Sequence, residues 1–270
     1  MPSPTIYFIT GANRSIGLAL VTELVKTKSD IHIFAAARTT SGALKELETK
    51  YPDKVSIVHF VAADEVSNRA AAKFVGDKFG RVDTVLAVAG IADFMGTVEE
   101  TPADSMNEHY RINVSGCLTL FQAFVPLLQK SEAPKFVPFT SAAASLTAYI
   151  HLPMGYTCYC TSKVALNYLA RRIHFENKWI TCFPLSPGIV KTDMGKRDAF
   201  AKDEDPTDFV LPSAIANRAM DKTGALAQVQ DTMAIEPDVA AKMLIDIVEG
   251  ATRDAQGGEF INIDGQKIPW

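Results

Sequence analysis

Short apolar runs alternate with longer amphipathic stretches along the chain. The runs are rich in β-branched residues and almost continuously apolar, which is typical of strands covered on both faces. The predicted strands are residues 5–10, 31–37, 55–60, 82–88, 135–140, 179–185 and 259–263. Between them, apolar positions at helical spacing predict helices at about residues 15–28, 42–50, 67–79, 103–130, 157–177 and 236–249.

This alternation of strands and helices implies right-handed crossovers and a parallel sheet. We therefore expect one α/β domain, residues 1–270, doubly wound (Rossmann-type) around a seven-stranded parallel sheet. Residues 193–233 break the alternation, because polar and apolar positions mix there around Pro206 and Pro212. So long an excursion is typical of a substrate lid, which we favour, or of a partly disordered loop.

Composition excludes several classes of partner. The net charge is −4 and no cluster of Lys and Arg occurs, so neither nucleic acid nor an anionic membrane surface is an expected partner. The amino-terminal stretch reads as a strand rather than a signal peptide, and no apolar run approaches the ~20 residues that cross a bilayer. The four cysteines show no metal-ligand spacing, so we expect reduced thiols, a cytoplasmic protein and no metal.

The stretch TGANRSIG, residues 10–17, joins the first strand to the first helix. Little side-chain bulk at Gly11 and Gly17 would let a phosphate approach backbone N–H groups at a helix amino terminus, although an ordinary strand-to-helix turn is the alternative. Ser15 stands where a third glycine is common. If the position needs a positive φ, Ser costs about 1 kcal/mol there, which a hydrogen bond from its hydroxyl to a phosphate could offset.

The end of the second strand bears on the choice of cofactor. A carboxylate there would bind a ribose 2′-hydroxyl and repel a 2′-phosphate, but the chain reads AAAR and ends in Arg38. Arg14 and Arg38 together could clamp a 2′-phosphate, which favours NADPH as the cofactor. The alternative is that both are solvated surface arginines. Asp64, after the third strand, could accept from the adenine amino group or simply cap the next helix.

Six motifs follow one another in a recognisable order. They are TGANRSIG (10–17), VAG (88–90), INVSG (112–116), FTSAAAS (139–145), YCTSK (159–163) and PGIVKTDM (187–194). With them the chain resembles the short-chain dehydrogenase/reductase family over nearly its whole length. HFEN, PGIVKTDM and the carboxy-terminal NIDGQKIPW are most similar to fungal ketoreductases of the norsolorinic acid reductase type.

The resemblance implies that Tyr159 is the catalytic acid/base and Lys163 its partner. Their spacing places both on one face of a helix. A free phenol has a pKa near 10, and an ammonium ~4 Å away is worth about 4 kcal/mol at an effective dielectric constant of about 20, so the expectation is a pKa for Tyr159 lowered by roughly three. Tyr159 would then donate a proton to a carbonyl oxygen while hydride arrives at carbon. A structural Tyr beside a surface Lys is the alternative.

The resemblance also implies a serine that hydrogen-bonds the carbonyl oxygen and an asparagine in a proton relay. Strict family spacing to Tyr159 favours Ser145, but Ser141 stands at the strand end, which the sheet fixes, and we choose Ser141. Asn113 is expected to order a water between Lys163 and bulk solvent. The alternative for Asn113 is a helix-interior side chain bonded to its own backbone.

We expect the cofactor to be bound by residues from each of these motifs. Pro187 and Gly188 would shape a turn over the nicotinamide, with Val190 offering its backbone and Thr192 its hydroxyl. The full set is Gly11, Asn13, Arg14, Ser15, Ile16, Gly17, Arg38, Asp64, Ala89, Gly90, Asn113, Tyr159, Lys163, Pro187, Gly188, Val190 and Thr192. Val88 departs from the family's usual Asn, so we expect one stabilising hydrogen bond of the central sheet to be lost.

The substrate is expected to lie between the 142–156 loop and the 193–233 lid. Apolar and aromatic side chains in these stretches favour a bulky, lipophilic ketone, such as a polyketide-like secondary metabolite. They are Leu146, Tyr149, Ile150, Leu152, Met154, Tyr156, Phe200, Phe209, Val210 and Leu211. An imine reductase or cyclase, and a non-catalytic NADP-binding sensor, are alternative functions. The resemblance further implies a homodimer or homotetramer.

Overall fold

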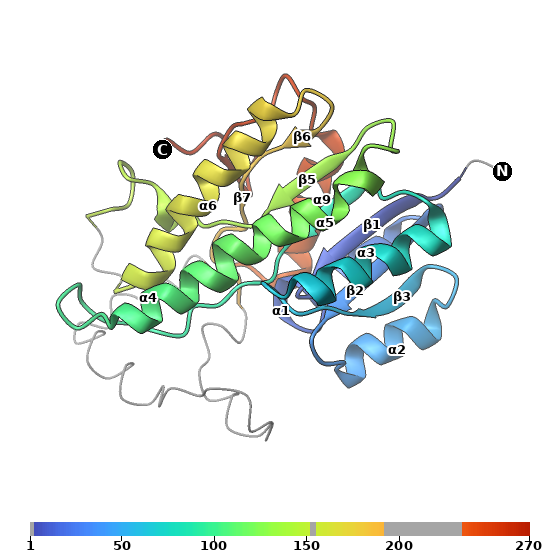
Figure 1. Ribbon diagram of the computed structural model, residues 1–270, viewed down its shortest axis with the longest axis horizontal. Coiled ribbons are helices and arrows are strands. Elements are labelled where there is room, and N and C mark those ends of the chain that lie inside the picture. The colour runs from blue at the N-terminus through green and yellow to red at the C-terminus, as the bar shows by residue number, and fades with distance from the viewer. Residues whose placement is uncertain (1–2, 152–154, 192–233) are drawn as a thin grey trace.

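A parallel sheet with helices on both faces organises the protein, as Figure 1 shows. The computed structural model describes residues 3–151, 155–191 and 234–270. The strands are β1 (Thr5–Thr10), β2 (Ile31–Ala37), β3 (Val55–His59), β4 (Thr84–Ala87), β5 (Lys135–Pro138), β6 (Thr181–Cys182), β7 (Leu185–Ser186) and β8 (Ile261–Asn262). The main helices are α1 (Ser15–Thr27), α2 (Gly42–Lys50), α3 (Glu65–Phe79), α4 (Ala103–Tyr110), α5 (Gly116–Leu128), α6 (Thr157–Glu176) and α9 (Pro237–Gly250).

The strand order of the main sheet is β3-β2-β1-β4-β5-β6, and every pairing is parallel. This is the doubly wound Rossmann order, which confirms the predicted fold. The order reverses between β1 and β4, and in such sheets ligands bind at the carboxyl ends of the strands beside that reversal. The glycine turn after β1 and the VAG stretch after β4 both lie at this point.

The predicted seventh strand does not join the main sheet, which has six strands. Pro184 interrupts the sixth predicted strand, because proline has no N–H to donate to a ladder. The chain continues as β7, which pairs with β8 in a separate two-stranded parallel ladder. The backbone N of Thr140 donates to Leu185 O at 2.9 Å and keeps β7 beside the end of β5.

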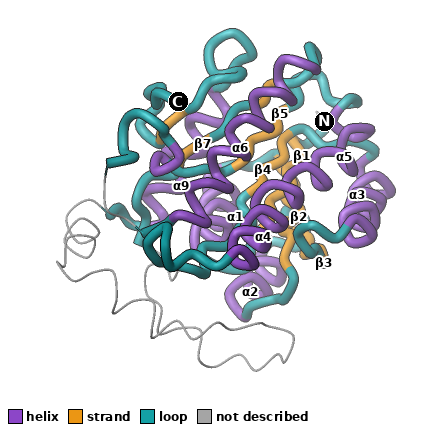
Figure 2. Tube along the Cα trace, turned by 60° about the vertical axis from the view of Figure 1, so that its left-hand side comes forward, coloured by secondary structure: helices purple, strands orange, loops and turns teal. Residues whose placement is uncertain are grey.

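Each face of the sheet has its own apolar core. Along β1, Tyr7 and Ile9 pack with α1, α2 and α9, while Ile6 and Phe8 pack on the opposite face with α3, α5 and α6. Figure 2 shows the strands enclosed between these two groups of helices. Because both faces are buried, the strands read as nearly continuous apolar runs in the sequence.

The helix expected at 103–130 is interrupted in its middle. A π-helical turn, η1 (Arg111–Ser115), separates α4 from α5 and contains Asn113. By length and composition, the stretch Ala103–Leu128 would be long enough to cross a membrane. It instead packs against α3, α6 and the sheet, as a core helix does.

The expected lid, residues 193–233, lies outside the described residues, as do Leu152, Met154 and Thr192.

Candidate active site

The turn after β1 brings the backbone of the first helix close to the end of the strand. Gly11 has a φ of +67°, and a Cβ there would lie 3.2 Å from the backbone of Ala89. A Cβ on Gly17 would lie 2.1 Å from Gly11 O, which no side chain can occupy. Ser15 has a φ of +51°, so it adopts the left-handed conformation whose cost we anticipated from the sequence. Ile16 follows it and packs against the α1 side of the core.

Asn13 ties this turn to the loop that follows β2. Its Oδ1 accepts from the backbone N of Ser41, and its backbone O accepts from Ser41 Oγ at 2.9 Å. Arg14 and Arg38 lie at exposed positions on the two loops that this link joins. The link therefore fixes the relative position of the two loops that carry the arginines expected to bind the 2′-phosphate.

Asp64 acts as the amino-terminal cap of α3. Its Oδ1 accepts from the backbone N of Ser67 at 2.9 Å, which is the capping role we weighed against an adenine contact. A carboxylate has further lone pairs, so the cap leaves the adenine contact possible. The adenine role stays a prediction.

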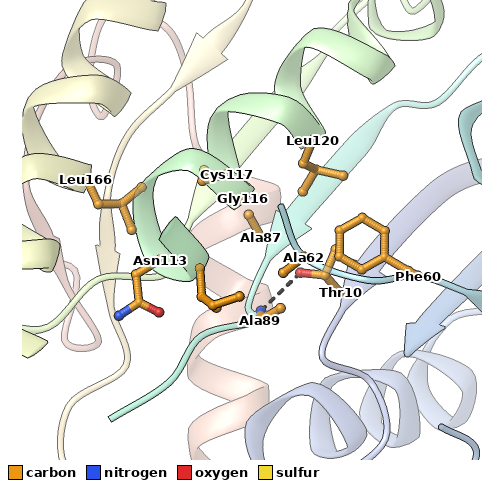
Figure 3. A pocket seen from close by; sticks show the side chains of 11 residues that line it. Thr10, Phe60, Ala62, Ala87, Ala89, Asn113, Gly116, Cys117, Leu120 and Leu166 are labelled. Carbon is orange, nitrogen blue, oxygen red and sulfur yellow. Dashed lines mark hydrogen bonds between the residues drawn. The ribbon is translucent and has the colours of Figure 1, made fainter. Parts of the chain in front are cut away.

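A single buried hydroxyl organises the loop after β4. Thr10 Oγ1 accepts from the backbone N of Val88 and of Ala89, each at 3.0 Å. Figure 3 shows the Thr10 hydroxyl directed at Ala89 in a small cavity between the ends of β1 and β4 and helix α5. Although Val88 lacks the amide of the family's usual Asn, Thr10 anchors this loop to the central strand.

Asn113 fastens the same loop from the other side. Its Oδ1 accepts from Ile91 N at 2.8 Å, and its Nδ2 donates to Ile91 O at 3.0 Å and to Ser162 Oγ at 2.9 Å. Ser162 Oγ in turn donates to Tyr159 O at 2.6 Å. Asn113 is only 2% exposed and bonds to a distant loop rather than to its own backbone, unlike the alternative we considered. Its relay role stays a prediction.

One helix turn before Asn113, a buried histidine bonds the same loop after β4 at Asp93. His109 Nε2 accepts from Asp93 N at 3.1 Å, and its Nδ1 bonds Ser105 O at 2.7 Å. Because a carbonyl can only accept, Nδ1 is the donor of that bond, and Nε2 is the acceptor from Asp93 N.

Tyr159 and Ser141 are brought together by the fold. Tyr159 lies in the first turn of α6, and its side chain interacts with that of Ser141 at the end of β5. Lys163, one turn later, is 4% exposed; its Nζ donates to Phe139 O at 2.7 Å and lies 5.5 Å from the centroid of the Tyr159 ring. A Cβ on Gly90 would meet Asn113 Oδ1 at 3.0 Å and Lys163 Nζ at 3.4 Å, so Gly90 lets these groups converge.

Burial governs the protonation of this pair. The pKa of Lys163 falls from 10.5 to about 8 because desolvation penalises its ammonium. The pKa of Tyr159 is raised, chiefly by burial, and the interaction with the Ser141 side chain only partly opposes the rise. The expectation that Lys163 lowers the pKa of Tyr159 is therefore wrong for these residues alone. Spacing in sequence shows that two groups are neighbours but not how deeply they are desolvated.

Ser145 is used elsewhere. Its Oγ donates to Pro269 O at 2.6 Å and accepts from Ala148 N at 2.9 Å, with no contact to Tyr159 among the described bonds. A hydroxyl has one proton, and Ser145 already donates its proton in the hydrogen bond to Pro269 O. This geometry supports Ser141 as the serine of the site.

The turn after β7 stands next to the loop of residues 141–150, which we call the serine loop. Ser186 Oγ accepts from Ala142 N at 2.9 Å and from Gly188 N at 3.5 Å, so one buried hydroxyl joins the two loops. Val190 forms a parallel bridge with Ile235. Pro187 and Gly188 therefore stand near Ser141, whereas Val190 lies beside Ile235 and Thr192 lies outside the described residues.

Sequence reasoning missed three hydroxyl residues that position the site: Thr10, Ser162 and Ser186. Each lies inside or beside a motif that we quoted, and each is buried. A polar residue in an otherwise apolar strand end was the available signal, because buried hydroxyls need partners. Within the described ranges, no group of three His, Cys, Asp or Glu residues is arranged to hold a metal ion.

Several exposed side chains of the segment between Ser141 and Tyr159 are apolar or aromatic. Leu146, Tyr149 and Ile150 are exposed by 59%, 39% and 65%. Tyr156 stands beside Tyr159, with ring centroids 5.9 Å apart. These side chains lie on the chain segment that connects the two candidate catalytic hydroxyls.

Comparison with known proteins agrees with this geometry. A family profile described as short chain dehydrogenase matches residues 5–203. The chain is similar to a norsolorinic acid ketoreductase of Aspergillus parasiticus, with 31% identity over 100% of this chain and 92% of the relative. It is also similar to an uncharacterised oxidoreductase of Schizosaccharomyces pombe, with 31% identity over 98% of both chains.

Solved structures show the same architecture. An NADPH-bound carbonyl reductase from chicken fatty liver superposes with a TM-score of 0.80 and 26% identity, covering 100% of both chains. The carbonyl reductase Sniffer of D. melanogaster has a TM-score of 0.80 at 20% identity, and this likeness shows the fold alone.

Proposed function

The chain belongs to the short chain dehydrogenase family, and on that premise we propose that it is an NADPH-dependent ketoreductase for bulky apolar ketones. Its relatives are ketoreductases and carbonyl reductases, so it is an oxidoreductase that acts on carbonyl groups. One observation carries the proposal: the Tyr159 and Ser141 side chains lie close enough to interact, one helix turn from a buried Lys163. Two hydroxyls so placed can both bond one carbonyl oxygen.

The residues divide the reaction between them. NADPH, when bound, supplies the hydride to the carbonyl carbon. Ser141 and Tyr159 would donate hydrogen bonds to the carbonyl oxygen, and such donors are typically worth about 3 kcal/mol in the transition state. The raised pKa of Tyr159 keeps its hydroxyl protonated at neutral pH, which suits a group that gives its proton to the developing alkoxide. The Lys163 ammonium stabilises the phenolate that remains.

The choice of NADPH rests on the loops after β1 and β2. Neither Arg14 nor Arg38 is accompanied by a carboxylate at the end of β2, where NAD-specific sites place one. Asn13 and Ser41 hold the two loops in a fixed relation. A structural relative, the chicken carbonyl reductase, was solved with NADPH bound.

The proposed substrate is a large, flat or lipophilic ketone, such as a polyketide-like secondary metabolite. Leu146, Tyr149 and Ile150 present apolar surface on the segment that connects the two hydroxyls, which a sugar or small acid would not use. Fungal relatives of the chain are norsolorinic acid ketoreductases. The expected lid at 193–233 would complete this pocket and remains part of the proposal.

The cofactor is tested without knowledge of the ketone. Fluorescence titration with NADPH and NADH should show at least tenfold tighter binding of NADPH, about 1.4 kcal/mol. Arg38→Ala should remove the preference by weakening NADPH alone, because only NADPH carries the 2′-phosphate. Arg172→Ala, an exposed arginine at the far end of α6 that pairs with Glu176, is the matched control. Equal affinity for both cofactors in the wild type would contradict the NADPH assignment.

The chemistry is tested with Tyr159→Phe, which removes only the hydroxyl. Reduction of 2-acetylnaphthalene should fall by at least a thousandfold, within the range for loss of an acid catalyst together with a hydrogen-bond donor. Tyr168→Phe, on the same helix but 69% exposed, should leave the rate unchanged. An unaffected rate in Tyr159→Phe would contradict Tyr159 as the acid. Imine reduction or cyclisation that persists in this variant would favour the imine reductase or cyclase. Tight NADPH binding without turnover of any carbonyl would favour the sensor.

Assembly and location are part of the same proposal. Tyr110, Tyr168 and Phe175 expose aromatic side chains on α4 and α6, surfaces that would suit a homodimer or homotetramer. Size-exclusion chromatography with light scattering would decide the state. A cytoplasmic location stays a prediction.

A further inference from the structure

A segment more than a hundred residues distant in sequence packs against the serine loop. We call residues 268–270 the strap. Ile268 N donates to Phe260 O at 2.7 Å, and the Trp270 ring stacks on Phe260 with centroids 5.6 Å apart. The Arg171 guanidinium of α6 lies 4.8 Å from the centroid of the Trp270 ring. The strap is therefore anchored both to the segment leading into β8 and to the helix that carries Tyr159.

From this anchored position, the strap holds the serine loop by two hydroxyls. Ser145 Oγ donates to Pro269 O at 2.6 Å, and Thr147 Oγ1 donates to Trp270 O at 3.0 Å. Ser145 Oγ also accepts from Ala148 N at 2.9 Å, which closes a local turn. Ser145 is 1% exposed, so its hydrogen bond is shielded from competing water.

The loop so held leads from one candidate catalytic hydroxyl to the other. Ser145 follows the 3₁₀ turn Ala142–Ala144, which begins directly after Ser141. Of the side chains that follow, Leu146 and Ile150 are mostly exposed, whereas Tyr149 is 39% exposed. Because Leu146 and Ile150 bury little apolar surface, the two hydroxyl contacts to the strap contribute much of what holds this part of the loop in place.

We propose that Pro269 and Trp270 are positioning residues for substrate specificity: through Ser145 and Thr147 they fix the 145–150 wall at the place where a bulky ketone binds. The inference rests on the proposed ketoreductase function for its kinetic consequence but not for its structural one. The strap touches neither Tyr159 nor Ser141 directly in the described contacts. Its effect should therefore fall on binding of large substrates and leave the chemical step on small ones intact.

The structural consequence is measured by hydrogen exchange of the protein without substrate. In Trp270→Ala and in Ser145→Ala, amides of residues 144–151 should exchange at least tenfold faster than in the wild type. Trp270→Phe keeps an aromatic ring on Phe260 and beneath Arg171 and should restore protection. Trp179→Ala removes the other tryptophan, which packs with the core on the α3 and α5 side, and serves as the control for a general loss of stability. Unchanged exchange at 144–151 in both Trp270→Ala and Ser145→Ala overturns the inference.

The kinetic consequence compares 2-acetylnaphthalene with 2,3-butanedione. Ser145→Ala, Thr147→Val and Trp270→Ala should raise KM for the naphthyl ketone about tenfold, the scale of one lost hydrogen bond. Values of kcat/KM for the small diketone and Kd for NADPH should stay within twofold. A merely structural role would lower activity on both ketones equally, as Trp179→Ala should, and that result overturns the inference.

The two proposals fail in different ways. If the wild type binds NADPH but reduces neither ketone, the proposed function fails, and the exchange data alone decide the strap: lost protection supports it and retained protection overturns it. If both ketones are reduced and the variants keep the same ratio of kcat/KM values, the function stands and the strap does not.

Discussion

Replacing Lys163 with Met should abolish carbonyl reduction while leaving the fold as stable or more stable at neutral pH. Lys163 is 4% exposed, and burial lowers its pKa from 10.5 to about 8. A difference of this size corresponds to about 3 kcal/mol of cost for holding the ammonium in the folded protein. Against it stands the bond to Phe139 O, whose unpaired carbonyl would cost about 1–3 kcal/mol in the Met variant. The expected net effect is a gain of about 0–2 kcal/mol.

The pH dependence of this difference has a definite sign. Because the folded pKa lies below the unfolded one, the cost is fully present below about pH 8 and disappears as the pH rises through 10.5. Urea unfolding of wild type and Lys163→Met at pH 7 and pH 10 should therefore show the variant's relative stability falling by about 2–3 kcal/mol. Comparing the two proteins at each pH cancels the other titrating groups. A difference that does not change with pH would refute a desolvated Lys163.

Activity should report the same ionisation. In the wild type, kcat/KM for ketone reduction should decline above about pH 8 as free enzyme loses the Lys163 ammonium. Lys163→Arg keeps its charge far above this range, so its profile, although lower, should stay level to pH 10. Tyr159 does not produce this decline, because its raised pKa keeps it protonated. A wild-type profile that is level to pH 10 would refute the reasoning.

Three further substitutions test the frame of the site. Asn113→Ala removes three hydrogen bonds and should lower the free energy of unfolding in urea by about 2–4 kcal/mol; a loss below about 0.5 kcal/mol would contradict the geometry. Gly17→Ala places a Cβ 2.1 Å from a backbone oxygen and should weaken NADPH binding more than tenfold by titration, whereas Gly42→Ala, with nothing within 4 Å, should not. Thr10→Val orphans two backbone N–H groups and should cost about 1–3 kcal/mol by thermal or urea unfolding, whereas Thr10→Ser should largely preserve stability.

Much of the fold was predictable because the signals are local. The expected helix at 42–50 matches α2, and the other expected helices start within two residues of those observed. Strands buried on both faces can be recognised in the sequence by their uninterrupted apolar runs. The prediction of a seventh strand in the main sheet was wrong. The last strand, β8, pairs with β7 rather than with β6, and this choice depends on how the chain bends at Pro184, which no local pattern specifies.

The site was predictable in part for the same reason. The Tyr159 and Lys163 pairing follows from helical spacing, and the strand-end position of Ser141 follows from the sheet. The use of Ser145 was open from sequence, since its partner Pro269 lies 124 residues away. The direction of the Tyr159 pKa was mispredicted, because burial is a property of the whole fold and the motif contains only the neighbouring charge.

The π-helical turn Arg111–Ser115 has a consequence for how this protein can tolerate insertions and deletions. A π turn holds one residue more than an α turn, so deleting one residue there would restore a continuous helix. The π turn takes up its extra residue locally, so α4 and α5 keep the same relative orientation with or without that residue. After a one-residue deletion, His109 would still face the 91–93 loop and α5 its core, but the turn that carries Asn113 would be lost. Deletions in this segment should therefore act on the contacts of Asn113, whereas the packing of the two flanking helices should tolerate them.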